Sequence, residues 1–157
     1  MNMVYQINIS KGGVPKWAVP EVVVDELGLI GDKQKDKRYH GGKERAVCLF
    51  SLQEIQRLQA EGHPIQVGST GENFTLSMSD YECLQPGSVL RIGKEVMLEI
   101  TSYAAPCKTI KDSFINENFT RISQKLHPGA SRLYTRVLCG GLVRTGDEVK
   151  VVASVAE

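Results

Sequence analysis

The spacing of short apolar runs between glycines constrains the fold of this chain more than any other feature. Its 15 glycines are spread along 157 residues rather than gathered in one tract, and glycines at such intervals mark turns between short elements. The runs between them carry strand patterns. They are residues 5–9, 22–24, 46–50, 89–92, 96–101, 133–138 and 149–153. The first run predicts a strand that buries Tyr5, Ile7 and Ile9 on one face.

Two segments carry helical patterns instead. Ser51 can cap a helix that starts after the third strand-like run, and Glu54 can reach back to close a capping box. Apolar residues then recur at helical spacing until Gly62. A second helix is predicted from about Ile110 to Leu126, because its apolar residues fall on one stripe. About seven or eight short strands and two helices predict a mainly β fold with a β-barrel-like core.

The composition excludes several classes of protein. The length suits a single domain over residues 1–157, with a core large enough to need no disulfide or metal. A net charge of +1 and 6% aromatic residues argue against nucleic acid as a partner. No apolar stretch of about 18 residues or signal peptide is found, so we expect no membrane partner and a cytoplasmic location with reduced thiols. The four cysteines lack zinc-site spacing.

The most polar segment runs from Gly31 to Arg45. It holds six basic residues against three acidic ones, and Gly41 and Gly42 follow His40. Glycine lets backbone N–H groups approach a ligand closely, so an anion site is the best functional interpretation. A solvated, charged loop is the alternative, and the pattern alone favours it.

A second polar segment, residues 68–75, places Glu72 and Asn73 after Gly71. A carboxylate and an amide side by side can match the donors and acceptors of a heterocycle. Equally, Gly71 can supply a turn in which Asn73 hydrogen-bonds its own backbone.

Cys107 is the candidate reactive thiol. It follows a strand, precedes the predicted second helix, and has Lys108 beside it. A helix N-terminus, an adjacent cation and a loop position all favour a thiolate. The alternative is a small buried hydrophobe, which suits Cys48 better because Cys48 lies inside an apolar strand.

Four segments in order along the chain resemble the MOSC family, named after the C-terminal domain of molybdenum cofactor sulfurase. They are residues 31–42, 68–74, 105–108 (Ala-Pro-Cys-Lys) and 132–137 (Arg-Leu-Tyr-Thr-Arg-Val). With no desulfurase or redox domain adjoining, the chain is similar to the stand-alone bacterial form. The resemblance implies a barrel-like, strand-rich fold and a molybdenum–pterin cofactor, and the family is also associated with pyridoxal phosphate.

The resemblance also implies which residues form the site. Cys107 would be the catalytic thiol and the metal ligand. The cofactor-binding residues would be Asp32, Gln34, Asp36, His40, Gly41, Gly42, Arg45, Glu72, Asn73, Lys108, Arg132 and Arg136. The basic residues among them suit a pterin phosphate, which guanidinium groups bind in a bidentate manner.

Three functions follow from the resemblance. The first is reduction of N-hydroxylated purines or related N–O compounds, with electrons from an external donor protein. The second is a sulfur carrier with a persulfide on Cys107. The third is a module that only binds or delivers the cofactor. The sequence predicts neither the substrate nor the oligomeric state.

Overall fold

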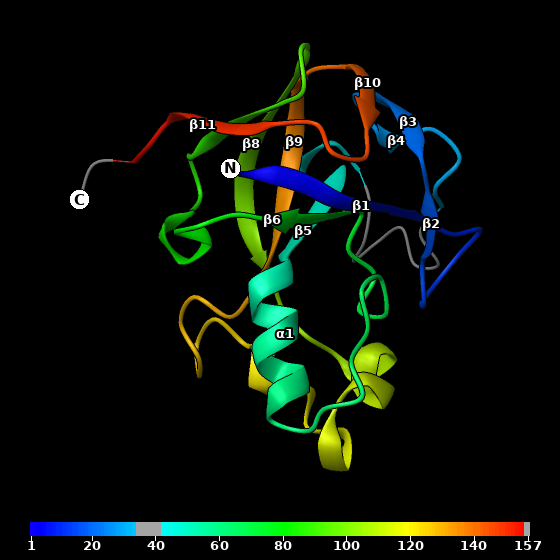
Figure 1. The fold of residues 1–157 in the computed structure, drawn as a ribbon, viewed down its shortest axis with the longest axis vertical. Coiled ribbons are helices and arrows are strands. Elements are labelled where there is room, and N and C mark those ends of the chain that lie inside the picture. Colours follow the sequence, from blue (N-terminus) through cyan, green and yellow to red (C-terminus); the bar gives the residue numbers. More distant parts are fainter. Residues whose placement is uncertain (34–41, 156–157) are drawn as a thin grey trace.

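The computed structural model describes residues 1–33 and 42–155, which form two β-sheets with helical turns below them (Figure 1). The strands are β1 (Met3–Ile9), β2 (Trp17–Val19), β3 (Glu21–Asp25), β4 (Gly28–Leu29), β5 (Val47–Ser51), β6 (Phe74–Ser77), β7 (Val89–Ile92), β8 (Val96–Ala104), β9 (Arg132–Cys139), β10 (Gly141–Arg144) and β11 (Val149–Ala153). The helices are α1 (Leu52–Ala60) and the 3-10 helices η1 (Lys43–Arg45), η2 (Tyr81–Cys83), η3 (Lys108–Ser113), η4 (Ile115–Glu117) and η5 (Phe119–Ile122). The predicted mainly β class is confirmed.

The larger sheet has eight strands in the order β11-β7-β8-β9-β5-β6-β1-β2, and the smaller has the order β10-β3-β4. A single bridge joins Met3 to Glu148, and the Val4 N–H donates to the Asp147 carbonyl at 2.9 Å. These contacts bring β1 back toward β11, but in the described chain β11 and β2 do not pair. The core is therefore barrel-like without being a closed barrel.

The inward face of β1 differs from the predicted one. The register with β6 shifts between Val4 and Gln6, so Val4, Ile7 and Asn8 are the fully buried residues of this strand while Tyr5 is 45% exposed. A bulge inserts one residue and reverses the alternation on one side of it. The prediction that Tyr5 is buried was therefore wrong.

Helix α1 begins where the sequence predicted. The Glu54 N–H donates to Ser51 Oγ at 3.1 Å, which caps the first turn. The Glu54 carboxylate accepts from Arg57 Nη1 at 2.5 Å rather than from the cap backbone, so only half of the predicted box forms. α1 has nine residues, and no helix in residues 1–33 and 42–155 has the length and apolar character needed to cross a membrane.

The predicted helix from Ile110 to Leu126 is wrong. The chain forms the three short 3-10 helices η3, η4 and η5 there. Phe114 is extended, and Asn116 has a left-handed backbone with φ 54°. These two residues interrupt the helical hydrogen bonds. Ile110, Phe114 and Ile122 are nevertheless buried together against Phe50 and α1 residues, so the apolar stripe correctly identified core residues but not the element that carries them.

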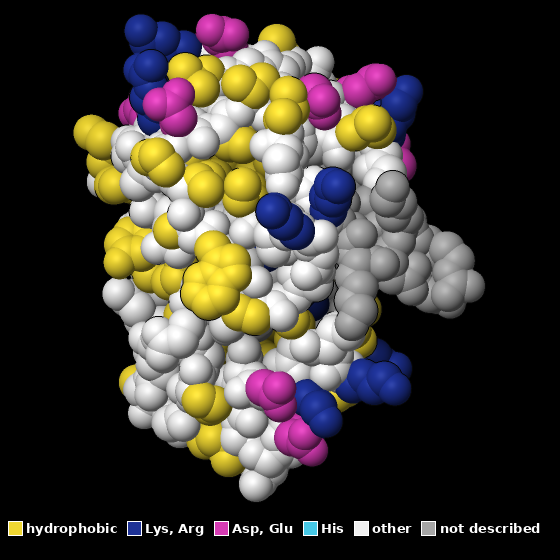
Figure 2. Space-filling view, turned by 90° about the vertical axis from the view of Figure 1, so that its right-hand side faces the viewer, with side chains coloured by type: hydrophobic (Ala, Val, Ile, Leu, Met, Phe, Trp, Pro, Cys, Tyr) yellow, Lys and Arg dark blue, Asp and Glu magenta, His cyan; other side chains and the backbone are white. Residues whose placement is uncertain are grey.

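The outer side of the smaller sheet carries both charged and apolar residues, since Glu21, Val23 and Asp25 of β3 are all exposed. Val23, Leu27 and Ile30 are 47%, 60% and 57% exposed, and hydrophobic side chains spread over much of the face that this sheet borders (Figure 2). Several of the buried charged and polar residues lie on β9 and in the segments around residues 16, 32 and 72. Those residues form the candidate site.

Candidate functional site

The structure describes most of the residues that the sequence predicts for the site. Gln34, Asp36, His40 and Gly41 lie outside the described residues. The described ones are Asp32, Gly42, Arg45, Glu72, Asn73, Cys107, Lys108, Arg132 and Arg136.

Asp32 lies at a buried junction of three segments. Its Oδ1 accepts from Lys16 Nζ at 2.6 Å and from the Ser10 N–H at 2.9 Å, and its Oδ2 accepts from Asn73 Nδ2 at 2.9 Å. The side chains of Lys16 and Asp32 are 7% and 2% exposed. The structure thus brings together Asp32 and Asn73, which the sequence separates widely. Lys16 was missed, because nothing in its sequence context marks it as buried.

Asn73 connects this junction to β5. Its Oδ1 accepts from the Cys48 N–H at 2.9 Å, and its own N–H donates to the Cys48 carbonyl at 2.8 Å. Its Nδ2 also contacts the Asn8 carbonyl at 3.3 Å. These bonds hold the polar segment 68–75 against β1 and β5, so Asn73 is fully engaged in positioning strands.

Glu72 is fully buried beside Asn73. Its Oε2 accepts from the Gly68 N–H at 3.0 Å and from Thr75 Oγ1 at 2.9 Å, and its Oε1 accepts from Thr70 Oγ1 at 3.0 Å. Burial raises the pKa of the Glu72 carboxyl, and these hydrogen bonds only partly oppose the rise. Gly68 has φ 84°, and a Cβ there would lie 2.6 Å from the Lys16 carbonyl oxygen. Only glycine fits this close approach.

The raised pKa of Glu72 gives a testable pH dependence. Its pKa is higher in the folded chain than in the unfolded chain, so its contribution to stability is greatest below the ordinary glutamate pKa of 4.5 and is lost as pH rises through the folded pKa. In a Glu72→Gln chain the amide can donate to Thr70, and no charge is buried. We expect the unfolding free energy of Glu72→Gln, relative to wild type, to increase with pH between about 4 and 8 in urea denaturation. A difference that stays constant with pH would contradict this.

Arg132 provides a buried positive charge on β9. It is 5% exposed, and its Nη1 donates to the Thr70 carbonyl at 2.7 Å. Its Nε is buried and has no hydrogen-bond partner among the described residues. A buried donor without a partner is uncommon in a folded protein, so this atom indicates where an additional acceptor would bind.

Tyr134 lies on the same face of β9, since residues two apart on a strand share a face. It pairs with Cys48 across the β5–β9 ladder and packs with Cys48 and Ala104. Burial raises its pKa to about 12, and negative charge on Cys48 and on Cys107 acts in the same direction. The Arg45 guanidinium carbon lies 5.3 Å from its ring centroid. Tyr134 was not among the predicted site residues, although the alternation of residues 132, 134 and 136 is a signal for a shared face.

Cys107 occupies the predicted position after a strand and before a helix. β8 ends at Ala104, and Cys107 is the N-cap of η3. The thiol is half-buried, and its Sγ lies 2.6 Å from Thr109 Oγ1. η3 is a 3-10 helix of six residues rather than the long helix predicted, so the partial charge at its N-terminus is smaller than expected. Lys108 is exposed.

Cys48, the other thiol of this region, is buried inside β5 as predicted. Burial raises its pKa to about 11, and the nearby Arg132 charge only partly opposes the rise. Cys48 is therefore a protonated thiol at neutral pH. Of the two cysteines whose charge acts on Tyr134, only Cys107 has an accessible sulfur.

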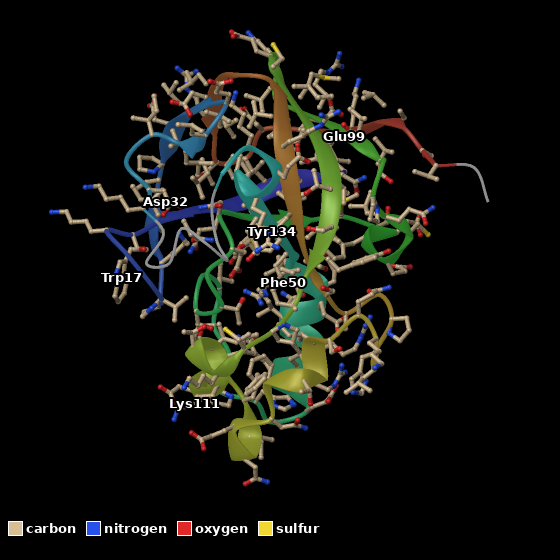
Figure 3. The ribbon with its side chains drawn as sticks, turned by 180° about the vertical axis from the view of Figure 1, so that it is seen from behind. Trp17, Asp32, Phe50, Glu99, Lys111 and Tyr134 are labelled. Carbon is tan, nitrogen blue, oxygen red and sulfur yellow. The ribbon has the colours of Figure 1, made fainter. Side chains whose placement is uncertain are left out.

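Arg136 and Gly42 lie nearer the surface. The Arg136 side chain is 47% exposed, and its Nε donates to Glu99 Oε1 at 2.6 Å. Gly42 is the N-cap of η1, with φ 80°, and among the described residues no atom lies within 4 Å of where a Cβ would be. In Figure 3, Asp32 and Tyr134 appear above the turns that carry Lys111.

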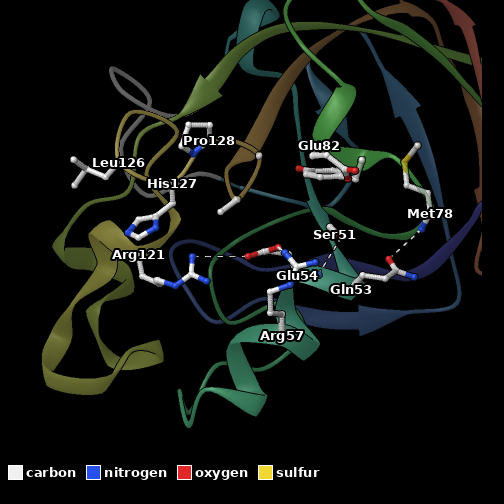
Figure 4. A pocket seen from close by; sticks show the side chains of 13 residues that line it. Ser51, Gln53, Glu54, Arg57, Met78, Glu82, Arg121, Leu126, His127 and Pro128 are labelled. Carbon is white, nitrogen blue, oxygen red and sulfur yellow. Dashed lines mark hydrogen bonds and ion pairs between the residues drawn. The ribbon is translucent and has the colours of Figure 1, made fainter.

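A separate hollow of about 540 Å³ lies at the start of α1 (Figure 4). In it, Arg121 Nη1 lies 3.9 Å from Glu54 Oε1. Its lining residues are Ser51, Gln53, Glu54, Arg57, Met78, Tyr81, Glu82, Arg121, Leu126, His127, Pro128, Gly129 and Ala130. None of them is a residue that the sequence predicted for the site.

Comparison with known proteins identifies a family. Residues 36–150 match the model of the MOSC domain. The chain is 30% identical over 137 residues to a reductase of Gibberella moniliformis, which covers 83% of this chain and 24% of that protein. It is 23% identical over 141 residues to protein YiiM of Escherichia coli, covering 87% and 62%. It is 26% identical over 147 residues to YflK, an uncharacterised protein of Bacillus subtilis, covering 92% and 65%. The chain thus spans less than two thirds of each of these relatives.

Solved structures share the fold. YiiM of Geobacillus stearothermophilus superposes with a TM-score of 0.74 at 20% identity, covering 98% of this chain and 76% of that one. YuaD of Bacillus subtilis gives 0.72 at 20% identity, covering 95% and 94%. At these identities the likeness establishes the architecture alone.

Proposed function

The chain belongs to the MOSC domain family, and from that premise we propose that it binds a molybdenum–pterin cofactor and reduces N-hydroxylated purines or related N–O compounds. Cys107 is the proposed metal ligand and catalytic thiol. One observation carries the proposal: an accessible thiol lies beside a strand face that bears a buried arginine with an unpartnered Nε.

The residues present fit such a group. Cys107 supplies a thiolate, a ligand type that suits a soft metal centre. Arg132 and Arg45 supply positive charge on the face around Tyr134, and Gly42 is a further proposed binding residue at the start of η1. Together these donors suit the phosphate of a pterin. Gln34, Asp36, His40, Gly41, Lys108 and Arg136 complete the proposed cofactor site.

Asp32, Glu72 and Asn73 have a different part in this proposal. The hydrogen bonds described above use the side-chain oxygens of all three. They border the cofactor site and fix the segments that form it. This is the supporting role that buried polar networks have around binding residues.

When bound, the cofactor would supply the two-electron redox chemistry. The overall conversion is R–NHOH + 2 e⁻ + 2 H⁺ → R–NH₂ + H₂O, so the N–O bond breaks and the oxygen leaves as water. The electrons come from an external donor protein. In this proposal the protein is a single cytoplasmic domain over residues 1–157 and binds neither nucleic acid nor a membrane. In the chain itself, Cys107 holds the metal while the arginines orient the anionic end.

The test is to purify the chain from cells that make the cofactor and to measure bound molybdenum and pterin. We expect both in the wild type and in an Arg144→Gln control, whose exposed side chain lies on β10. Cys107→Ser should lose its bound molybdenum. In Arg132→Gln, the contents of both molybdenum and pterin should fall by about ten-fold or more.

The same preparation separates the three functions. Cofactor together with N-hydroxy reductase activity supports the proposal. Cyanide-releasable sulfur on Cys107 without molybdenum would contradict the reductase function and support the sulfur-carrier function instead. Bound cofactor without activity, even when a reductant is supplied, would contradict the reductase function and support a module that only binds or delivers the cofactor.

A further inference from the structure

We infer that Tyr134 is a positioning residue, whose ring holds the Arg45 guanidinium on the same face as Arg132 so that both arginines bind one phosphate group. The inference rests on the proposed function, because it takes this face of β9 as the site of an anionic ligand. It adds a residue that no sequence pattern assigned to the site.

The ring of Tyr134 is a fixed platform. The residue is 8% exposed and packs against Cys48 and Ala104. It is held in the middle of the sheet, because β9 pairs with β5 on one side and with β8 on the other. A ring held in this way cannot move far when a ligand arrives.

The Arg45 guanidinium lies over the Tyr134 ring. Arg45 is the last residue of η1 and is exposed, yet its guanidinium carbon lies 5.3 Å from the Tyr134 ring centroid. The following residue is tied to β9, because the Ala46 N–H donates to the Thr135 carbonyl at 2.9 Å. A cation over an aromatic face is attracted by the ring quadrupole. The guanidinium is therefore held beside the strand rather than free in solvent.

Holding Arg45 matters for ligand affinity. A mobile arginine side chain loses rotamer entropy when it binds a ligand. A side chain whose guanidinium is already held against an aromatic ring loses less. Arg132 is on the same face, with its buried Nε unpartnered. Two guanidinium groups near one aromatic ring suit the several oxygens of a phosphate monoester.

The experiment is a double-mutant cycle on binding, with no need of cofactor or activity. Phenyl phosphate is titrated at low salt by calorimetry into wild type, Tyr134→Phe, Tyr134→Leu, Arg45→Gln and the Tyr134→Leu/Arg45→Gln double variant. We expect Tyr134→Phe to bind within about two-fold of wild type, and Tyr134→Leu and Arg45→Gln to bind about five-fold more weakly. The double variant should bind no more weakly than Arg45→Gln, because Tyr134 acts through Arg45. Arg144→Gln is the matched control and should bind as wild type does.

Each other outcome overturns the inference in a recognisable way. Wild-type affinity in Tyr134→Leu would refute the role of the ring while leaving the proposed anion site intact. Losses that add in the double variant would mean that Tyr134 acts independently of Arg45, and an equal loss in Tyr134→Phe would assign the effect to the hydroxyl. No binding by wild type would refute the anion site itself, and the inference with it.

Thermal melts of each variant establish that it is folded. If Tyr134→Leu does not fold, Arg45→Lys takes its place, because lysine keeps the charge but stacks less well on a ring. We expect it to bind about three-fold more weakly than wild type. Unchanged affinity in Arg45→Lys would also overturn the inference.

Discussion

A Cys107→Ser chain is expected to lose N-hydroxy reductase activity by about a hundred-fold or more while its unfolding free energy changes by less than about 1 kcal/mol. Serine has nearly the shape of cysteine, and Cys107 is only half-buried, so the fold tolerates the change. A serine hydroxyl stays protonated near neutral pH and is a poor ligand for a metal that prefers sulfur. The measurement is activity with bound cofactor, alongside urea denaturation.

The other cysteines provide the controls. Cys83 and Cys139 are exposed, so they compete for thiol reagents. Replacing both with serine leaves Cys107 and the buried Cys48. In that background a thiol reagent should modify Cys107 first, because Cys48 is buried and its pKa is raised to about 11. Faster modification of Cys48, or full activity in Cys107→Ser, would show that Cys107 is structural.

Replacement of Asp32 with alanine should lower the unfolding free energy by about 3–5 kcal/mol, the cost of breaking a buried ion pair from one side. The change leaves the Lys16 ammonium, 7% exposed, without the carboxylate that lies 2.6 Å away. It also leaves the Ser10 N–H without its acceptor and removes one from Asn73 Nδ2. Urea denaturation measures the loss.

A second substitution tests the cause. If the cost comes from the uncompensated Lys16 charge, Lys16→Met combined with Asp32→Asn should be clearly more stable than Asp32→Ala, since no charge is then buried. The asparagine keeps an acceptor for the Ser10 N–H. Two variants of equal stability, or a loss below about 1 kcal/mol in Asp32→Ala, would mean that the pair is well solvated after all.

The elements that the sequence predicted correctly have strong local signals. β5 is a continuous apolar run, α1 starts at a capping serine, and β7 and β8 flank a glycine turn. The segment 110–126 had an equally regular apolar stripe, yet it folds as separate 3-10 helices. Its apolar residues find partners on Phe50 and α1 without a continuous helix. An apolar spacing thus predicts which residues are buried better than it predicts the backbone that buries them.

The site was predictable only in part, for a related reason. Cys107 and Asn73 have informative neighbours in the sequence. Lys16 becomes part of the junction only because β2 and the turn before it pack on residues 68–71, where the Lys16 N–H donates to the Gly68 carbonyl. Tyr134 becomes part of the site because β9 pairs with β5. Such contacts depend on strand order, which no local pattern specifies.

The junction around Asn73 also bears on how this protein folds. Its hydrogen bonds join residues that are 25, 41 and 65 positions apart, and the Met3–Glu148 bridge joins residues separated by most of the chain. Each such contact requires a long loop to close before it stabilises anything. Chains dominated by distant pairings fold in about milliseconds to seconds, far more slowly than helical bundles. The junction should therefore mature late in refolding, and the Asp32→Ala change should mainly speed unfolding rather than slow folding.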